Sequence, residues 1–282
     1  MRVVSLNLNG LRSACRKGFL DWVVRQRADL VCLQETRIQD HQLTPRMRAP
    51  GRFQGFFACA ERPGYSGVGL YSRFRPDRVE AGFGFAEADR EGRLLRLDFG
   101  RLSVVSLYLP SGSSHPERQA AKDRFLAVFL EWLRERGRDG REWLICGDWN
   151  IAHREIDLKN WRSNQKTSGF LPHERAWMDR VFEETGFVDV HRRLRPEDTG
   201  EAYTWWSNRG RAWEKNVGWR IDYQVATPGL AETAQEVRVY KRKRFSDHAP
   251  LILDYAWELE AEELRPQRRR AAGPETPAAP AR

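Results

Sequence analysis

The chain has 282 residues, of which 40% are hydrophobic, and carries a formal net charge of +9 with a sequence pI near 9.7. This length and apolar content suit one α/β domain with a sizeable core, and the basic balance is compatible with a polyanionic partner. The first strand begins without a secretory signal and no apolar run could cross a bilayer, so we expect no membrane association and a cytoplasmic location.

The elements expected along the chain are many short strands and few helices. We expect strands at 3–8, 30–33, 53–60, 67–72, 94–99, 102–109, 143–146, 203–206, 219–226 and 250–255. Apolar residues at helical spacing predict helices at 17–26 and after Pro116 and Pro172. Because few strands are followed by a helix, sheets packed face to face with helices outside are favoured over a Rossmann fold.

After about Leu259 the composition turns to Glu, Arg, Pro and Ala. Such a segment has little apolar surface to bury. We therefore expect a catalytic domain over residues 1–258 and a disordered tail over 259–282.

Polar side chains stand where the apolar strands end. These residues are Asn7 and Asn9, Glu35, Asp148 and Asn150, Asp222, and Asp247 with His248. Each alone is more often a turn or surface residue. Together, oxygen ligands from several strand ends would suit Mg²⁺ or Mn²⁺ if they converge in space.

Phosphodiester hydrolysis is a reaction that such a set could carry out. A cation would neutralise developing charge, and a carboxylate would orient or deprotonate the attacking water. Asp148 and Asn150 are two residues apart, so on a strand they would point the same way. His248, oriented by a carboxylate such as Asp222, could donate to the phosphate.

Six motifs resemble exodeoxyribonuclease III, the DNA-repair branch of the DNase I-like endonuclease/exonuclease/phosphatase superfamily. They are SLNLNGLR at 5–12, LQET at 33–36, GVGL at 67–70, GDWN at 147–150, WRID at 219–222 and SDHAP at 246–250. The likeness runs in order from Met1 to about Trp257. It implies a four-layer α/β sandwich with two packed, mainly antiparallel sheets, and a Mg²⁺-dependent DNA-repair nuclease.

The resemblance implies a role for each polar strand end. The metal ligands would be Glu35 as the main ligand, Asn7 beside it and Asp247. The catalytic residues would be Asp148 as the water-activating carboxylate, Asn150 as its amide partner, Tyr108 at the scissile phosphate, and Asp222 with His248 as the Asp–His pair. The implied activities are 3′-to-5′ exonuclease, abasic-site endonuclease and 3′-phosphatase.

The stretch from 205 to 220 combines tryptophans with basic residues, which fits a DNA-contacting surface. By resemblance, Trp205 and Trp219 line a pocket for an extruded deoxyribose, although some tryptophans of the stretch should be core. Further phosphate-contact candidates are Arg220, Lys122, Arg162, Asn164 and Lys166. The expected partner is duplex DNA with abasic sites or 3′ ends, bound by a monomer.

Departures from the family pattern, which include the stretch 160–170, leave the balance among the activities open. Leu-Pro-Ser-Gly follows Tyr108 where well-known members have a glutamine before the glycine, and GDWN has Trp149 in place of the commoner phenylalanine. Two alternatives also remain. One is a non-catalytic, RNA-associated regulator of the catabolite repression control type, and the other is a superfamily phosphatase acting on inositol or lipid phosphates.

Overall fold

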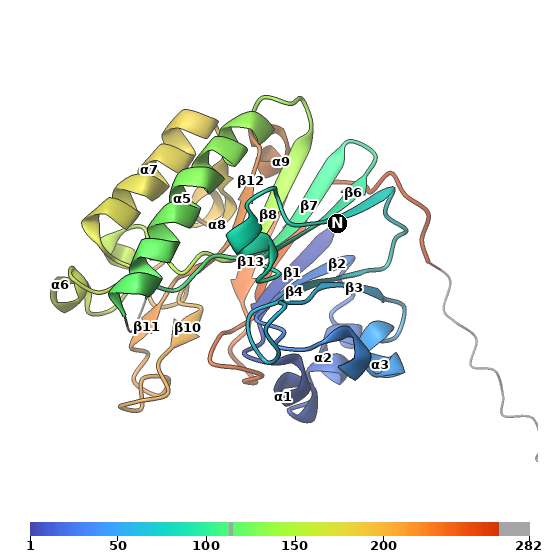
Figure 1. Cartoon of the computed structure of the whole chain (residues 1–282), viewed down its shortest axis with the longest axis horizontal. Helices are drawn as coiled ribbons and strands as arrows, with labels where there is room; N and C mark the ends of the chain where they lie inside the picture. Colours follow the sequence, from blue (N-terminus) through green and yellow to red (C-terminus); the bar gives the residue numbers. More distant parts are fainter. Residues whose placement is uncertain (113–114, 265–282) are drawn as a thin grey trace, which may run out of the picture.

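The computed structural model describes residues 1–112 and 115–264, which form two six-stranded sheets packed face to face with helices outside (Figure 1). The first sheet, in the order β13-β14-β1-β2-β4-β3, contains β1 (Arg2–Asn7), β2 (Leu30–Gln34), β3 (Gln54–Ala58), β4 (Val68–Ser72), β13 (Ala234–Val239) and β14 (Leu251–Tyr255). The second, in the order β5-β6-β7-β8-β12-β9, contains β5 (Arg78–Ala81), β6 (Leu94–Phe99), β7 (Leu102–Tyr108), β8 (Glu142–Asp148), β9 (Val188–Asp189) and β12 (Asp222–Ala226). The pairs β1–β2 and β7–β8 are parallel and the other paired neighbours are antiparallel, so the predicted sandwich is confirmed.

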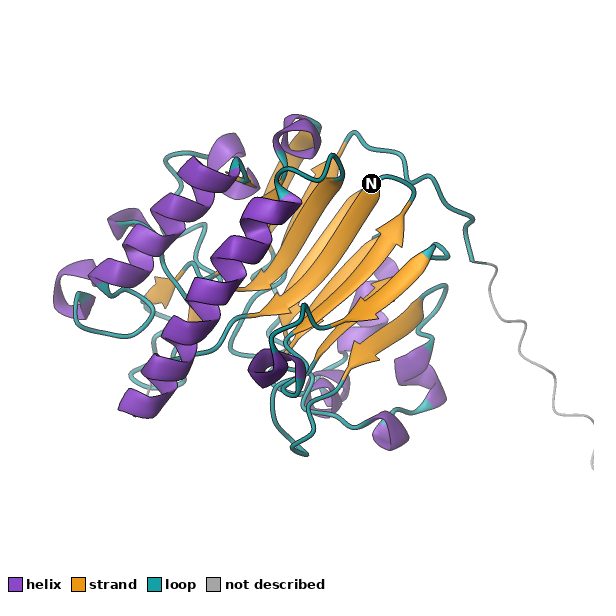
Figure 2. Ribbon diagram, turned by 45° about the horizontal axis from the view of Figure 1, so that its top comes forward, coloured by secondary structure: helices purple, strands orange, loops and turns teal. Residues whose placement is uncertain are grey.

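Helices cover the outer face of each sheet (Figure 2). The helices near the first sheet are α1 (Leu11–Arg16), α2 (Phe19–Arg25) and α3 (Pro45–Arg48). The second sheet is covered mainly by α5 (Pro116–Arg136) and α7 (Pro172–Thr185). Shorter elements are α4 (Ala86–Asp89), α6 (Trp161–Asn164), α8 (Val190–Leu194), α9 (Pro228–Glu232), η1 (Asp40–Gln42), η2 (Glu155–Asp157) and a small sheet of β10 (Trp205–Trp206) with β11 (Gly218–Trp219).

The central strands are apolar because both of their faces are covered. All five residues of β2 are buried, as are six of the seven in β8. One face of each strand packs in the core between the sheets, and the other packs against a helical layer. Strands of this kind are near-continuous hydrophobic runs, which is why their positions could be predicted.

Other predicted boundaries differ from the structure. Gly18, with a left-handed φ of 83°, separates α1 from α2, so the helix predicted at 17–26 begins only at Phe19. The strand predicted at 219–226 is divided between β11 and β12. The edge strands β5 and β13 were not predicted, because several of their residues are exposed and polar.

The expected domain boundary at residue 258 falls before the last described contacts. The amide of Leu264 donates to the carbonyl of Arg73, and the amide of Arg75 donates to the carbonyl of Glu262. Residues 259–264 therefore lie against the domain, while 265–282 are outside the described residues. Among the helices that the structure describes, none has the length and apolarity to span a membrane.

The structure contradicts the prediction that Arg220 contacts a DNA phosphate. Its side chain is 1% exposed. Nε donates to Oδ1 of Asp157 at 2.7 Å, Nη2 donates to Oδ2 of Asp189 at 2.7 Å, and the guanidinium lies 4.3 Å from the Tyr223 ring centroid. Arg220 thus links η2, β9 and β12 inside the protein.

We predict that Arg220→Met lowers the free energy of unfolding by about 3–5 kcal/mol, because two buried carboxylates lose a charged partner. Urea unfolding measures the change. Arg134→Gln, which removes a partly exposed cation, should cost less than about 1 kcal/mol. A fully stable Arg220→Met protein with weakened DNA binding would restore the phosphate-contact interpretation.

Candidate active site

The catalytic candidates of the second sheet lie side by side in one row across three strands. Tyr108 ends β7, Asp148 ends β8 and Asp222 begins β12. The strand register pairs Tyr108 with Asp148 and Asp148 with Asp222. The predicted convergence of these strand ends is therefore built into the hydrogen-bonded ladder.

The first sheet contributes Asn7 at the end of β1 and Glu35 directly after β2. Nδ2 of Asn7 donates to Oδ2 of Asp148 at 2.8 Å and to Oε2 of Glu35 at 3.1 Å. Asn7 and Asp148 are buried, and Glu35 is partly buried with a φ of 52°. One amide thus connects acidic groups from both sheets.

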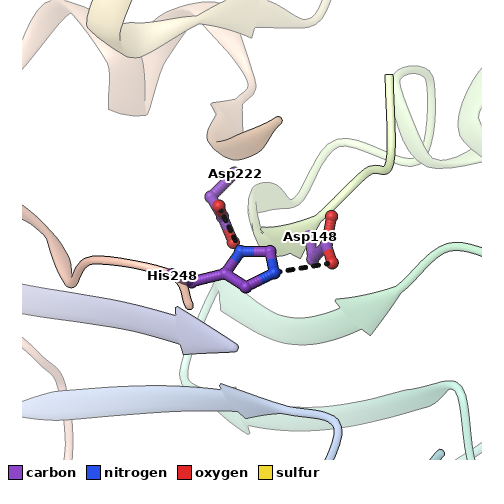
Figure 3. Close-up of side chains that lie close together, drawn as sticks. All are labelled: Asp148, Asp222 and His248. Atoms are coloured by element: carbon purple, nitrogen blue, oxygen red, sulfur yellow. Dashed lines mark hydrogen bonds and ion pairs between the residues drawn. The ribbon is translucent and has the colours of Figure 1, made fainter. Parts of the chain in front are cut away.

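His248 lies between the two carboxylates of the second sheet (Figure 3). Its Nδ1 is 2.8 Å from Oδ2 of Asp222, and its Nε2 is 3.8 Å from Oδ2 of Asp148. All three side chains are buried. The three residues offer ligand atoms within 4.8 Å of one another and so form one possible metal site.

Burial and neighbouring charges shift the pKa values of Asp148 and His248. Burial raises the pKa of Asp148 to about 7, although His248 opposes the shift. Burial favours the neutral form of His248, but Asp222 and Asp148 outweigh it and raise the pKa of the imidazole to about 10. At neutral pH the ring is therefore protonated, donates Nδ1–H to Asp222 and lies within ion-pair distance of Asp148.

The carboxylates predicted as metal ligands, Glu35 and Asp247, have other polar partners. Nε of Arg37 donates to Oε1 of Glu35 at 2.9 Å. Nδ2 of Asn9 donates to Oδ1 of Asp247 at 2.9 Å, and Nε1 of Trp205 donates to its Oδ2 at 3.2 Å. Burial opposes ionisation of Asp247, but His248, Asn9 and Trp205 outweigh it and lower its pKa.

The sequence predicts that the side chain of Asn150 points into the site from a strand, and the structure contradicts this prediction. It lies beyond β8 with a left-handed φ of 51°. Its backbone N–H donates to Oδ1 of Asp148 at 2.9 Å, whereas Nδ2 donates to the carbonyl of Leu109 at 2.8 Å. Asn150 therefore partners Asp148 through its backbone, because the turn redirects its side chain.

Lys122 is likewise not an exposed phosphate contact. Its side chain is 0% exposed, and Nζ lies 2.6 Å from Oε1 of Glu174. Nζ also donates to the carbonyl of Asn150 at 2.9 Å. In the sequence, a lysine on an amphipathic helix is expected on the exposed face, but Lys122 faces the interior.

The two predicted pocket residues, Trp205 and Trp219, form an aromatic wall together with Phe170. We define the aromatic wall as these three residues. The Trp205 and Trp219 ring centroids are 6.2 Å apart, and those of Trp219 and Phe170 are 6.4 Å apart. Trp205 and Trp219 are partly exposed, whereas Trp206 is buried in the core. The wall is adjacent to Asp247 through the Trp205 hydrogen bond.

The remaining predicted DNA contacts lie on α6 and the segment after it. Arg162 is exposed and its guanidinium lies 4.7 Å from the Trp161 ring centroid. Nδ2 of Asn164 donates to the carbonyl of Asn160 at 2.8 Å, and Lys166 is exposed. The side chains of Arg162 and Lys166 are accessible to a ligand, while the amide of Asn164 is engaged within its helix.

Arg37 and Arg93, which had no predicted role, also belong to the site, and Asn9, which was predicted only as one of the polar strand ends, contacts Asp247 there. Arg93 is 4% exposed, donates to the carbonyl of Tyr108 at 3.0 Å and lies 4.9 Å from the Tyr108 ring centroid. Asn9 is part of the first motif and Arg37 follows the second, so proximity in sequence could have indicated them. For Arg93 no comparable sequence signal exists.

Comparisons with known proteins identify the family of the chain. Residues 4–248 match the model of the Endonuclease/Exonuclease/phosphatase family. The chain is 38% identical over 254 residues to an exodeoxyribonuclease of Bacillus subtilis (strain 168), covering 90% of this chain and 98% of the relative. It is 36% identical over 256 residues to the DNA repair nuclease APEX1 of Danio rerio, and the alignment covers 90% of this chain and 81% of that relative.

The fold is similar to the solved structure of an AP endonuclease from Archaeoglobus fulgidus, with a TM-score of 0.81 and 26% identity over 91% of this chain and 100% of that one. The family match spans most of the chain, and the Bacillus subtilis relative is aligned over nearly its whole length. The chain therefore belongs to the Endonuclease/Exonuclease/phosphatase family, as its resemblance to exodeoxyribonuclease III predicts.

Proposed function

We propose that the chain is a metal-dependent DNA-repair nuclease acting on duplex DNA. It would hydrolyse phosphodiester or phosphomonoester bonds at abasic sites and 3′ ends, as AP endonuclease, 3′-to-5′ exonuclease and 3′-phosphatase. The observation that carries the proposal is the junction of Asn7, Glu35, Asp148 and the Asp222–His248 pair at the ends of both sheets. The names of the related nucleases support the choice of DNA as substrate.

We assign the cation, Mg²⁺ or Mn²⁺, to Glu35, Asn7 and Asp247. Carboxylate and amide oxygens are hard ligands that suit these ions. The guanidinium of Arg37 interacts electrostatically with both Glu35 and Asp247, so these two carboxylates already attract a cation. When bound, the cation would neutralise charge that develops on the phosphate.

The residues of the chain would perform the remaining steps. Asp148, fixed by the Asn7 amide and the Asn150 N–H, would accept a proton from the attacking water. His248, held by Asp222, would donate a hydrogen bond to a phosphate oxygen. In this role His248 is a donor, and for that reason we do not assign it as a metal ligand.

We predict that Asp148→Asn lowers kcat by roughly 10²- to 10⁴-fold, because it removes the proton acceptor while keeping the side-chain volume. Single-turnover cleavage of an abasic-site duplex with Mg²⁺ measures the effect, and circular dichroism checks the fold. Cleavage at the wild-type rate would remove Asp148 from the mechanism.

The wild-type assay should offer four substrates: an abasic-site duplex, a 3′-phosphate duplex, a recessed 3′ end and single-stranded RNA. We expect cleavage of the three DNA substrates. A wild-type protein that binds the RNA and cleaves none of the four would support the non-catalytic regulator instead.

For the metal, we predict that EDTA stops cleavage and that Glu35→Gln weakens Mn²⁺ binding at least roughly tenfold, because a charged ligand is lost. Electron paramagnetic resonance of free Mn²⁺ measures binding without any activity assay. The matched variant Asp222→Asn should bind Mn²⁺ nearly as wild type. If Asp222→Asn loses binding and Glu35→Gln retains it, the cation belongs to Asp148, Asp222 and His248.

For the DNA surface, we predict that duplex affinity falls steeply with salt, because bound phosphates release counterions. Neutralising Arg162 and Lys166 to glutamine should lower the slope of log Kd against log salt by about 1 per residue that contacts a phosphate. Fluorescence anisotropy in EDTA measures the slope. Arg134→Gln is the control, since Glu131 and Glu184 already pair with that cation. If Arg134→Gln lowered the slope by the same amount, the change would reflect only the general loss of positive charge.

A further inference from the structure

Lys122 and Glu174 form an ion pair that is closed off from solvent. Both side chains are 0% exposed, with Nζ 2.6 Å from Oε1. Lys122 is on α5 and Glu174 is on α7, so the pair joins the two helices that cover the second sheet. Burying two charges costs free energy that their attraction often fails to recover, so stability alone is a weak explanation for this pair.

The ammonium group also holds the catalytic loop, which we define as residues 148–152. It donates to the carbonyl of Asn150 at 2.9 Å. Asn150 has a φ of 51°. For a residue other than glycine this backbone conformation is strained, and it persists only where the surrounding structure fixes it. The N–H of Asn150 donates to Asp148, so Lys122 binds the carbonyl of the same residue whose N–H orients the proposed base.

The carboxylate group holds a second segment, the wall loop, which we define as residues 168–171. Oε2 of Glu174 accepts from the amides of Gly169 at 2.6 Å and Leu171 at 3.0 Å. The carbonyl of Gly169 accepts from the amide of Ala152 at 2.7 Å. Phe170 of the wall loop packs against Trp219, so this loop supports the aromatic wall.

We propose that the Lys122–Glu174 pair is a positioning device that fixes the catalytic loop to the wall loop. It sets Asp148 relative to the aromatic wall while touching no substrate itself. The inference rests on the proposed function because Asp148 is the proposed base. A misplacement of about 1 Å in such a group can cost up to about 100-fold in rate.

The double variant Lys122→Met/Glu174→Gln tests the proposal. Methionine retains most of the lysine volume, and the amide oxygen of glutamine can still accept from Gly169 and Leu171. We expect kcat on an abasic-site duplex to fall roughly 10- to 100-fold. The Kd for the same duplex in EDTA should stay at the wild-type value, because neither residue is exposed to DNA.

The matched control is Arg134→Gln/Glu184→Gln. It removes another ion pair between α5 and α7, but one that is partly exposed. Residue 134 is twelve positions along the helix from Lys122, or about 18 Å. This control should keep kcat and Kd at wild-type values, so a loss shared by both double variants would mean that the pair only joins the helices and would overturn the proposal.

Gly169→Ala perturbs the same loops while leaving the ion pair in place, and it remains informative if the double variant does not fold. Gly169 has a φ of 94°, and an added Cβ would lie 3.1 Å from the carbonyl oxygen of Asn150. We expect a fall in kcat at unchanged Kd. A wild-type kcat in a folded double variant, or in Gly169→Ala, overturns the proposal.

Amide hydrogen exchange gives a readout that does not depend on activity. In the double variant, or in Gly169→Ala if the double variant does not fold, residues 148–152 and 168–171 should exchange faster, with α5 and α7 unchanged. Wild-type exchange in both loops overturns the positioning role. If instead the wild-type enzyme cleaves none of the DNA substrates while the loops respond as expected, it is the proposed function that fails.

Discussion

One amide group joins the two sheets at the place where their strands end. Asn7 closes β1, and its Nδ2 donates both to Glu35 of the first sheet and to Asp148 of the second. Without a shared donor, two carboxylates brought together would repel each other. The distance between the sheets, which the apolar core sets, therefore decides whether these acids can act together.

The same junction keeps charge inside the protein at a cost in stability. Asp148 and Asp222 are cross-strand neighbours, an arrangement that is destabilising when both are ionised. His248 offsets the repulsion because its ring donates a hydrogen bond to Asp222 and forms an ion pair with Asp148. Oδ1 of Asp222 is buried with no hydrogen-bond partner among the described residues, and a group of this kind costs about 1–3 kcal/mol. These costs support the catalytic role that we propose for the cluster of Asp148, Asp222 and His248, which does not serve stability.

The sequence allowed the sandwich and most of the polar junction to be predicted, because buried strands are apolar runs and the residues after them lie at a common edge. The turn after β8 could not be predicted: only the structure shows that Asn150 leaves the extended conformation and presents its N–H to Asp148. The burial of Lys122 and Arg220 was missed for a different reason. The partners Glu174 and Asp157 are 52 and 63 residues away along the chain, and residue type alone does not reveal them.

These two buried cations change how the basic character of the chain is understood. Lys122 and Arg220 are each paired with interior carboxylates, so they add nothing to the field that a DNA backbone would meet. The formal surplus of +9 must then come from other residues, such as Arg162 and Lys166, which are exposed. Cations next to the motifs therefore have two separate roles: the exposed ones can attract the polyanion, and the buried ones link interior elements, as Arg220 does for η2, β9 and β12 and as Lys122 does for α5, α7 and the turn after β8.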